Sequence, residues 1–96
     1  MNTDKYLAQR RFEIANNIRR FRRFNGWTQE QMAEYLNCSL SRIARVEKAH
    51  AELTVGELEL LAEAFNVRLF HLLSYPEEEY LEKKIMEIIT ALGKDN

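Results

Sequence analysis

The chain has 96 residues, of which 46% are hydrophobic and 10% aromatic, and its formal net charge is −1. These values predict one small folded domain and favour a packed core over a disordered chain. No run of about 18 apolar residues is present, so we expect no membrane span. The N-terminus lacks the apolar core of a signal peptide, and the single cysteine, Cys38, cannot form an intrachain disulfide. Both features fit a cytoplasmic protein.

Charge is divided unevenly along the chain. Residues 1–50 hold ten basic and five acidic residues, whereas residues 51–96 hold four basic and ten acidic ones. The balanced total argues against a strongly basic nucleic-acid binder, but the distribution matters more than the sum. We therefore expect a basic front half and an acidic rear half.

The first predicted helix runs from about Phe12, or from Tyr6 at the earliest, to Phe24. Its inward residues recur at helical spacing, and Asn25 and Gly26 end it. Residues 1–11 are then an N-terminal extension. Four arginines crowd the second half of this helix, and a solvated face and contacts to phosphate both remain open for three of them: Arg19, Arg20 and Arg23.

Residues 28–48 predict two short helices joined by a tight turn. Thr28 and Gln31 form a capping box that starts the first of them. Asn37 tolerates the left-handed conformation needed to leave this helix sharply. Ser39 is a good N-cap for the second helix.

The second of these helices has an apolar side and a basic, polar side. Ile43 and Val46 point inward, which leaves Ser41, Arg45 and Lys48 on the outer face at spacings of four and three. Leu40, Arg42 and Ala44 flank that face. A helix that lies in the major groove of DNA needs such a face, while a partner helix holds it in place.

Three further helices follow. Thr54 and Glu57 form a capping box for the fourth helix, which ends at Asn66, and a short fifth helix holds the apolar residues of 69–73. Arg68 is a poor N-cap, so we expect the first turn of the fifth helix to fray. The sixth helix starts around Ser74, Pro76 and Glu77 and stops at Gly93. Its apolar stripe, at spacings of four, three and four, consists of Leu81, Ile85, Ile88 and Leu92.

The apolar stripe of the sixth helix has two interpretations. It packs on its own domain, on the same helix of a second subunit, or on both. We favour a homodimer, because the five preceding helices already resemble a complete domain.

The segment 14–73 resembles the Cro and phage-repressor type of helix-turn-helix transcription regulators, also called the xenobiotic-response-element (XRE) type. The matching residues are Ile18, Phe21, Arg22, Thr28, Gln29, Met32, Ala33, Leu36, Ile43, Val46, Glu47, Leu58, Leu61, Ala62, Ala64, Phe65, Val67 and Leu72. The resemblance implies an all-α fold: a five-helix, lambda-repressor-like domain at residues 12–73. Residues 74–96 then form an added amphipathic dimerisation helix.

The resemblance also implies residue roles. Gln29 contacts a phosphate, Ser39 touches the DNA backbone, and the base edges face Leu40, Ser41 and Arg45. Arg22 and Glu47 form a structural salt bridge. To these we add Arg42 and Lys48 as backbone contacts, from the helix face. The chain departs from the family where glycine is usual, at Asn37 and Ala49, and Ala49 predicts a different path for the next loop.

These features predict a sequence-specific, double-stranded DNA-binding regulator of a bacterium or phage. We expect a repressor that binds a palindromic operator as a homodimer, since one recognition helix reads too few base pairs to be selective in a genome. The alternative is a protein-interaction module or antitoxin-like subunit that binds a protein partner through the acidic rear and the last helix. We expect no enzyme, cofactor or small-molecule domain, and no metal site, because His50 and His71 lack partners at ligand spacing.

Overall fold

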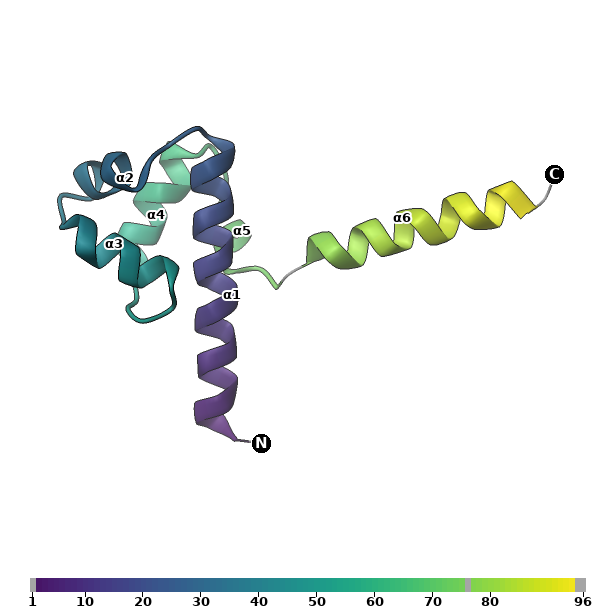
Figure 1. Ribbon diagram of the computed structural model, residues 1–96, viewed down its shortest axis with the longest axis horizontal. Coiled ribbons are helices and arrows are strands. Elements are labelled where there is room, and N and C mark those ends of the chain that lie inside the picture. Colours follow the sequence, from purple (N-terminus) through teal and green to yellow (C-terminus); the bar gives the residue numbers. More distant parts are fainter. Residues whose placement is uncertain (1, 76, 95–96) are drawn as a thin grey trace.

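The computed structural model describes residues 2–75 and 77–94, and within the last helix it describes the side chains of residues 85–93. Over these residues the protein is all-α, as predicted. Its helices are α1 (Thr3–Phe24), α2 (Gln29–Tyr35), α3 (Leu40–Glu47), α4 (Val55–Ala64), α5 (Leu69–Leu73) and α6 (Glu77–Lys94). Figure 1 shows α1 to α5 gathered into one domain, from which α6 projects.

One apolar side chain from each of the first five helices meets in the core. Ile18, Met32, Ile43, Leu61 and Leu72 are each at most 2% exposed. Burying a large aliphatic side chain contributes about 1.5–3 kcal/mol, so this shared contact holds all five helices together. Trp27 covers one side of the core, with its ring edge-on to Tyr35 and Phe65 at centroid distances of 5.3 and 5.1 Å.

Helix ends follow the predicted local signals. Thr28 Oγ1 accepts from the backbone N–H of Gln31 at 3.1 Å, and the Gln31 side chain accepts from the Thr28 N–H at 2.7 Å. Thr54 and Glu57 repeat this reciprocal arrangement at the start of α4. Asn37, at the exit of α2, has a left-handed φ of 53°. Each predicted signal satisfies backbone groups that a helix end would leave unpaired.

Two predicted helix starts need correction. The N-cap of α1 is Asn2, whose side chain accepts from the Lys5 N–H at 3.1 Å, so the helix starts well before Phe12 or Tyr6. We name residues 3–9 the α1 overhang. These residues are exposed, and apolar side chains do not recur among them at helical spacing. The sequence pattern therefore could not show that they are helical. At α5 the Arg68 side chain forms no cap, but the Arg68 N–H donates to Nδ1 of His71 at 3.0 Å. The first turn of α5 is therefore held.

The described side chains of α6 face solvent. Ile85, Ile88 and Leu92 are 55%, 58% and 65% exposed, so this part of the stripe does not pack on its own domain. The side chain of Leu81 and residue Pro76 lie outside the described residues. The helix continues through Gly93 to Lys94, one residue beyond the predicted stop.

Candidate nucleic-acid interface

Helix α3 exposes one face to solvent and buries the opposite face in the core. Ile43 is fully buried and Val46 is 2% exposed. Ser39 caps the helix by accepting from the Arg42 N–H at 3.1 Å, and its own side chain remains exposed. On the outer face the structure brings together four exposed side chains: Leu40, Ser41, Arg45 and Lys48. A rigid, polar and basic helix face of this kind has the chemistry to read base edges and bind phosphates.

The end of α3 is tied to α1 by a buried ion pair. Arg22 Nε and Nη2 donate to the two carboxylate oxygens of Glu47 at 2.6 and 2.9 Å, and Arg22 Nη1 donates to the Trp27 carbonyl at 2.7 Å. The salt bridge implied by the resemblance is therefore present. Such bidentate, charge-assisted bonds fix direction as well as distance.

Gln29 is also turned toward this ion pair. Its Nε2 donates to Oε1 of Glu47 at 3.0 Å, and the residue is half-buried. An amide nitrogen carries two hydrogens, so one N–H remains for the phosphate contact that the resemblance implies. Gln29 thus joins the start of α2 to the end of α3.

Arg42 lies in a different environment from the one expected. Its guanidinium donates to both carboxylate oxygens of Glu57 on α4, at 2.5 and 2.8 Å, and to the Glu52 carbonyl at 3.3 Å. The guanidinium lowers the pKa of Glu57 to about 2, since the pair favours the ionised carboxylate. The structure therefore places Arg42 in the contact between α3 and α4. Sequence spacing put it beside the outer face and gave no sign of Glu57 as its partner.

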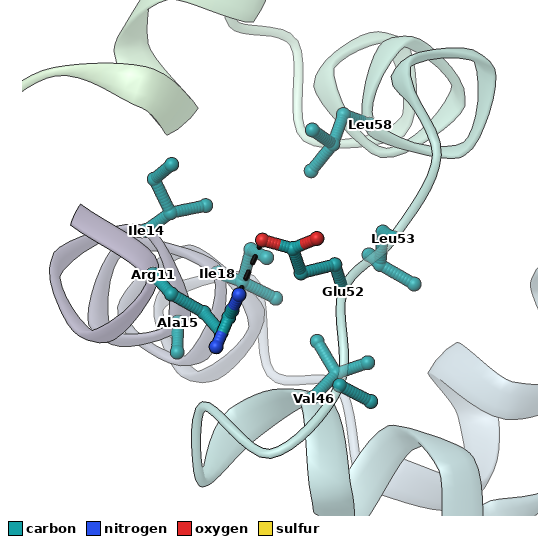
Figure 2. Close-up of a pocket in the computed structure, with 9 residues that line it drawn as sticks. Arg11, Ile14, Ala15, Ile18, Val46, Glu52, Leu53 and Leu58 are labelled. Carbon is teal, nitrogen blue, oxygen red and sulfur yellow. Dashed lines mark hydrogen bonds and ion pairs between the residues drawn. The ribbon is translucent and has the colours of Figure 1, made fainter. Parts of the chain in front are cut away.

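The loop after α3 is held in place by its backbone and by α1. Ala49 has a left-handed φ of 63°, the conformation for which glycine is usual, and the His50 N–H donates to the Arg45 carbonyl at 2.8 Å. Arg11 Nε donates to Glu52 at 3.0 Å. Figure 2 shows this ion pair beside a largely apolar cavity of about 200 Å³ between α1, the loop and α4. Ala49 therefore adopts the left-handed conformation for which glycine is usual.

Exposed basic and exposed acidic residues lie on different helices. On α3 and its C-cap the exposed charged residues, Arg45 and Lys48, are basic. On α2 and α4 they are acidic: Glu30, Glu34, Glu59 and Glu63. The electrostatic field around α3 therefore favours a polyanion more than the net charge of −1 implies.

Neither a metal site nor a membrane-spanning helix is found in the described part of the chain. Among the residues whose side chains the structure describes, 2–75 and 85–93, no group of three or more His, Cys, Asp or Glu is placed to hold a metal ion. None of the described helices is long and apolar enough to cross a bilayer.

Comparison with known proteins points to one family. The helix-turn-helix family model matches residues 18–72. The chain is similar to the competence pilus inhibition repressor of Acinetobacter baylyi, at 37% identity over 54 residues, covering 56% of this chain and 49% of that protein. It is also similar to the control protein C.SmaI of Serratia marcescens, at 34% identity over 61 residues, covering 64% of this chain and 73% of that protein. The chain thus spans about half the length of the Acinetobacter relative.

The fold also resembles a solved structure. The hypothetical transcription factor NHTF from Neisseria matches with a TM-score of 0.64 at 30% sequence identity. The match covers 73% of this chain and 80% of that one. Because it extends over more of the chain than the segment matched by the family model, it includes residues outside that segment.

Proposed function

The chain belongs to the Cro and phage-repressor (XRE) type of helix-turn-helix family of DNA-binding transcription regulators, and we propose that it acts in the cytoplasm as a homodimeric repressor of a palindromic operator. The observation that carries this proposal is the exposed, basic outer face of α3 on a fully buried apolar back. Residues 12–73 would form the DNA-binding domain and residues 74–96 the dimerisation element.

Each residue of the outer face has a proposed role. Arg45 reads a base, with guanine as the best match, because its guanidinium fits the O6 and N7 acceptors. Ser41 and Leu40 refine the choice of base, Leu40 by touching a thymine methyl group. Ser39 and Lys48 contact the DNA backbone.

Two of the expected phosphate contacts have other partners in the structure. Gln29 keeps one free N–H beside its bond to Glu47 and remains in the proposed site. Arg42 is paired with Glu57, so a phosphate at Arg42 would compete with that carboxylate. We therefore expect the Arg42 contact to be the weakest of the set.

The proposed dimer rests on α6. Ile85, Ile88 and Leu92 expose an apolar stripe at heptad-like spacing, and such a stripe is stabilised by packing on a second copy of itself. Leu81 extends the stripe by its position in the sequence. Two-fold symmetry would place two α3 helices one DNA turn apart, on half-sites centred about 10 base pairs apart.

Selection from a random duplex pool, read by sequencing, tests the proposal. The wild-type protein should enrich a palindrome. Arg45→Ala should lose one fixed base in each half-site, at a cost of about 1–3 kcal/mol. Lys48→Ala is the matched control, because loss of a phosphate contact should weaken all sequences alike and make the salt dependence shallower. Unchanged base preference in the Arg45 variant would refute that residue's role.

A second candidate function uses the same fold to bind a protein. The exposed stripe of α6 and the acidic surfaces of α2 and α4 favour it. No enriched duplex at any salt concentration, together with a stable hetero-complex of stated composition, would support an antitoxin-like or other partner-binding subunit over the operator-binding repressor.

A further inference from the structure

The chain leaves the domain through a segment that α1 holds along several turns. We name Leu72–Tyr75, the last two residues of α5 and the two residues that follow it, the exit segment. Asn17 Nδ2 donates to the Leu72 carbonyl at 3.0 Å and to the Ser74 carbonyl at 2.8 Å. Arg10 Nη2 donates to the carbonyl between them, that of Leu73. Three successive carbonyls are thus bound by two side chains of one helix.

These carbonyls lie where the backbone of α5 ends. The last carbonyls of a helix have no partner within it and require one from elsewhere. Asn17 is only 3% exposed, so its amide is committed to this task. Because the Asn17 side chain is buried, a displaced exit segment would leave a buried donor unsatisfied.

The last residue of the exit segment is held by its side chain. The Arg10 guanidinium lies over the Tyr75 ring at 4.1 Å from the centroid, and Tyr75 Oη is 3.2 Å from Tyr6 Oη in the α1 overhang. Arg10 is itself steadied by an ion pair with Glu13 at 3.2 Å. Tyr6, Arg10 and Asn17 therefore line one side of α1 and hold the chain just before it reaches α6. We call these three residues and Tyr75 the exit clamp.

We propose that the exit clamp sets the half-site spacing that the dimer accepts, by fixing the direction in which the chain leaves each DNA-binding domain. This inference rests on the proposed function, because it requires two domains joined through α6. Its residues need not touch DNA. They would act as positioning residues, and the α1 overhang would serve this purpose rather than DNA binding.

Two linked domains that bind one duplex must each meet their own half-site. Each inserted base pair moves one half-site by about 3.4 Å along the axis and turns it by about 35° around the axis. Domains on flexible connections would follow such changes at little cost, whereas a stiff connection favours the one spacing that it spans. Loosening the clamp should therefore change spacing preference without changing how one domain reads one half-site.

The test compares wild-type protein with Arg10→Ala/Tyr75→Ala on matched duplexes. The duplexes carry the palindrome selected by the wild type, the same palindrome with one or two base pairs inserted at its centre, and a single half-site. We expect two inserted base pairs to weaken wild-type binding at least about tenfold, and to weaken binding of the double variant less than about threefold. Single half-site affinity should agree within about twofold between the two proteins, and the variant should remain dimeric in sedimentation.

Arg11→Ala is the matched control, since Arg11 is the next residue on α1 but its ion pair goes to Glu52. It should keep the wild-type spacing preference. If the double variant loses half-site binding, Tyr6→Phe/Tyr75→Phe replaces it, because this pair keeps both rings and removes only the hydroxyl contact. A smaller spacing penalty in that variant supports the clamp, and an unchanged one overturns it.

If the wild-type protein selects no palindrome, the proposed function falls and the clamp falls with it. If a palindrome is selected but the clamp variants discriminate among spacings as the wild type does, only the clamp is overturned.

Discussion

Arg22 and Glu47 join α1 to the last residue of α3 through two charge-assisted hydrogen bonds of 2.6 and 2.9 Å, and their side chains are 8% and 3% exposed. Glu47 also accepts from Gln29, the first residue of α2. The Glu47 carboxylate thus fixes the relative positions of α1, α2 and α3, and α3 carries the outer face that is proposed to contact DNA bases.

Removing one partner of this pair should destabilise the domain severely. Glu47→Ala leaves the Arg22 guanidinium buried without its counter-charge, so we expect a loss of about 3–5 kcal/mol in the free energy of unfolding, measured with urea. Replacing both partners by Arg22→Met/Glu47→Leu should recover most of that loss, because no buried charge remains. A loss below about 1 kcal/mol for the single variant would contradict this account.

The ion pair between Arg42 and Glu57 should make stability depend on acid pH. The pKa of Glu57 is lowered from 4.5 to about 2 in the folded protein. The pair therefore contributes its full stability above about pH 4.5, and this contribution is lost as pH falls toward 2. Glu57→Gln should lose less unfolding free energy than the wild type over that interval. Glu59→Gln, an exposed change on the same helix, should follow the wild type.

The left-handed turn at Ala49 should be a site where glycine stabilises the protein. A non-glycine residue in this conformation costs about 1–2 kcal/mol, whereas glycine adopts it readily but adds entropy to the unfolded chain. We expect Ala49→Gly to raise the free energy of unfolding by about 0.5–1 kcal/mol. Ala44→Gly, within α3, should lower it by about 1 kcal/mol, since helical alanine is better than helical glycine. Equal signs for the two changes would refute the argument.

The apolar stripe of α6 should control the oligomeric state. Ile85→Asp/Ile88→Asp places two charges where the dimer is proposed to pack, so sedimentation should show monomers. Thr90→Asp, on another side of the same helix, should leave the dimer intact. A persistent dimer in the double variant would place the interface elsewhere.

Local sequence signals predicted most helix ends. Thr28 with Gln31, and Thr54 with Glu57, sit three residues apart, and each pair satisfies its own backbone. Asn37 marks its turn because few residue types tolerate a positive φ. Such features depend on neighbours in the sequence, so the sequence alone reveals them.

Long-range polar contacts could not be predicted in this way. Arg42 looks like a surface residue until α4 brings Glu57 to it, and Asn17 bonds to carbonyls 55 and 57 residues further along the chain. The only available signal for Asn17 was a polar residue on a helix side otherwise filled by Ile14 and Ile18. The start of the α1 overhang, residues 3–5, was missed because exposed turns leave no apolar period.

The sorting of exposed charge among the helices bears on how fast the protein finds its site. A polyanion such as DNA attracts the side of the protein that carries α3 and repels the surfaces of α2 and α4. We therefore expect the protein to turn its α3 side toward the DNA as it approaches. This steering acts on the association rate and fades with salt, since the screening length is about 10 Å at 0.1 M. On α3 and its C-cap only Arg45 and Lys48 carry exposed positive charge, so we expect few phosphates to be neutralised and binding to random sequence to be weak. We therefore expect the protein to approach DNA with α3 toward it and to dissociate readily from random sequence.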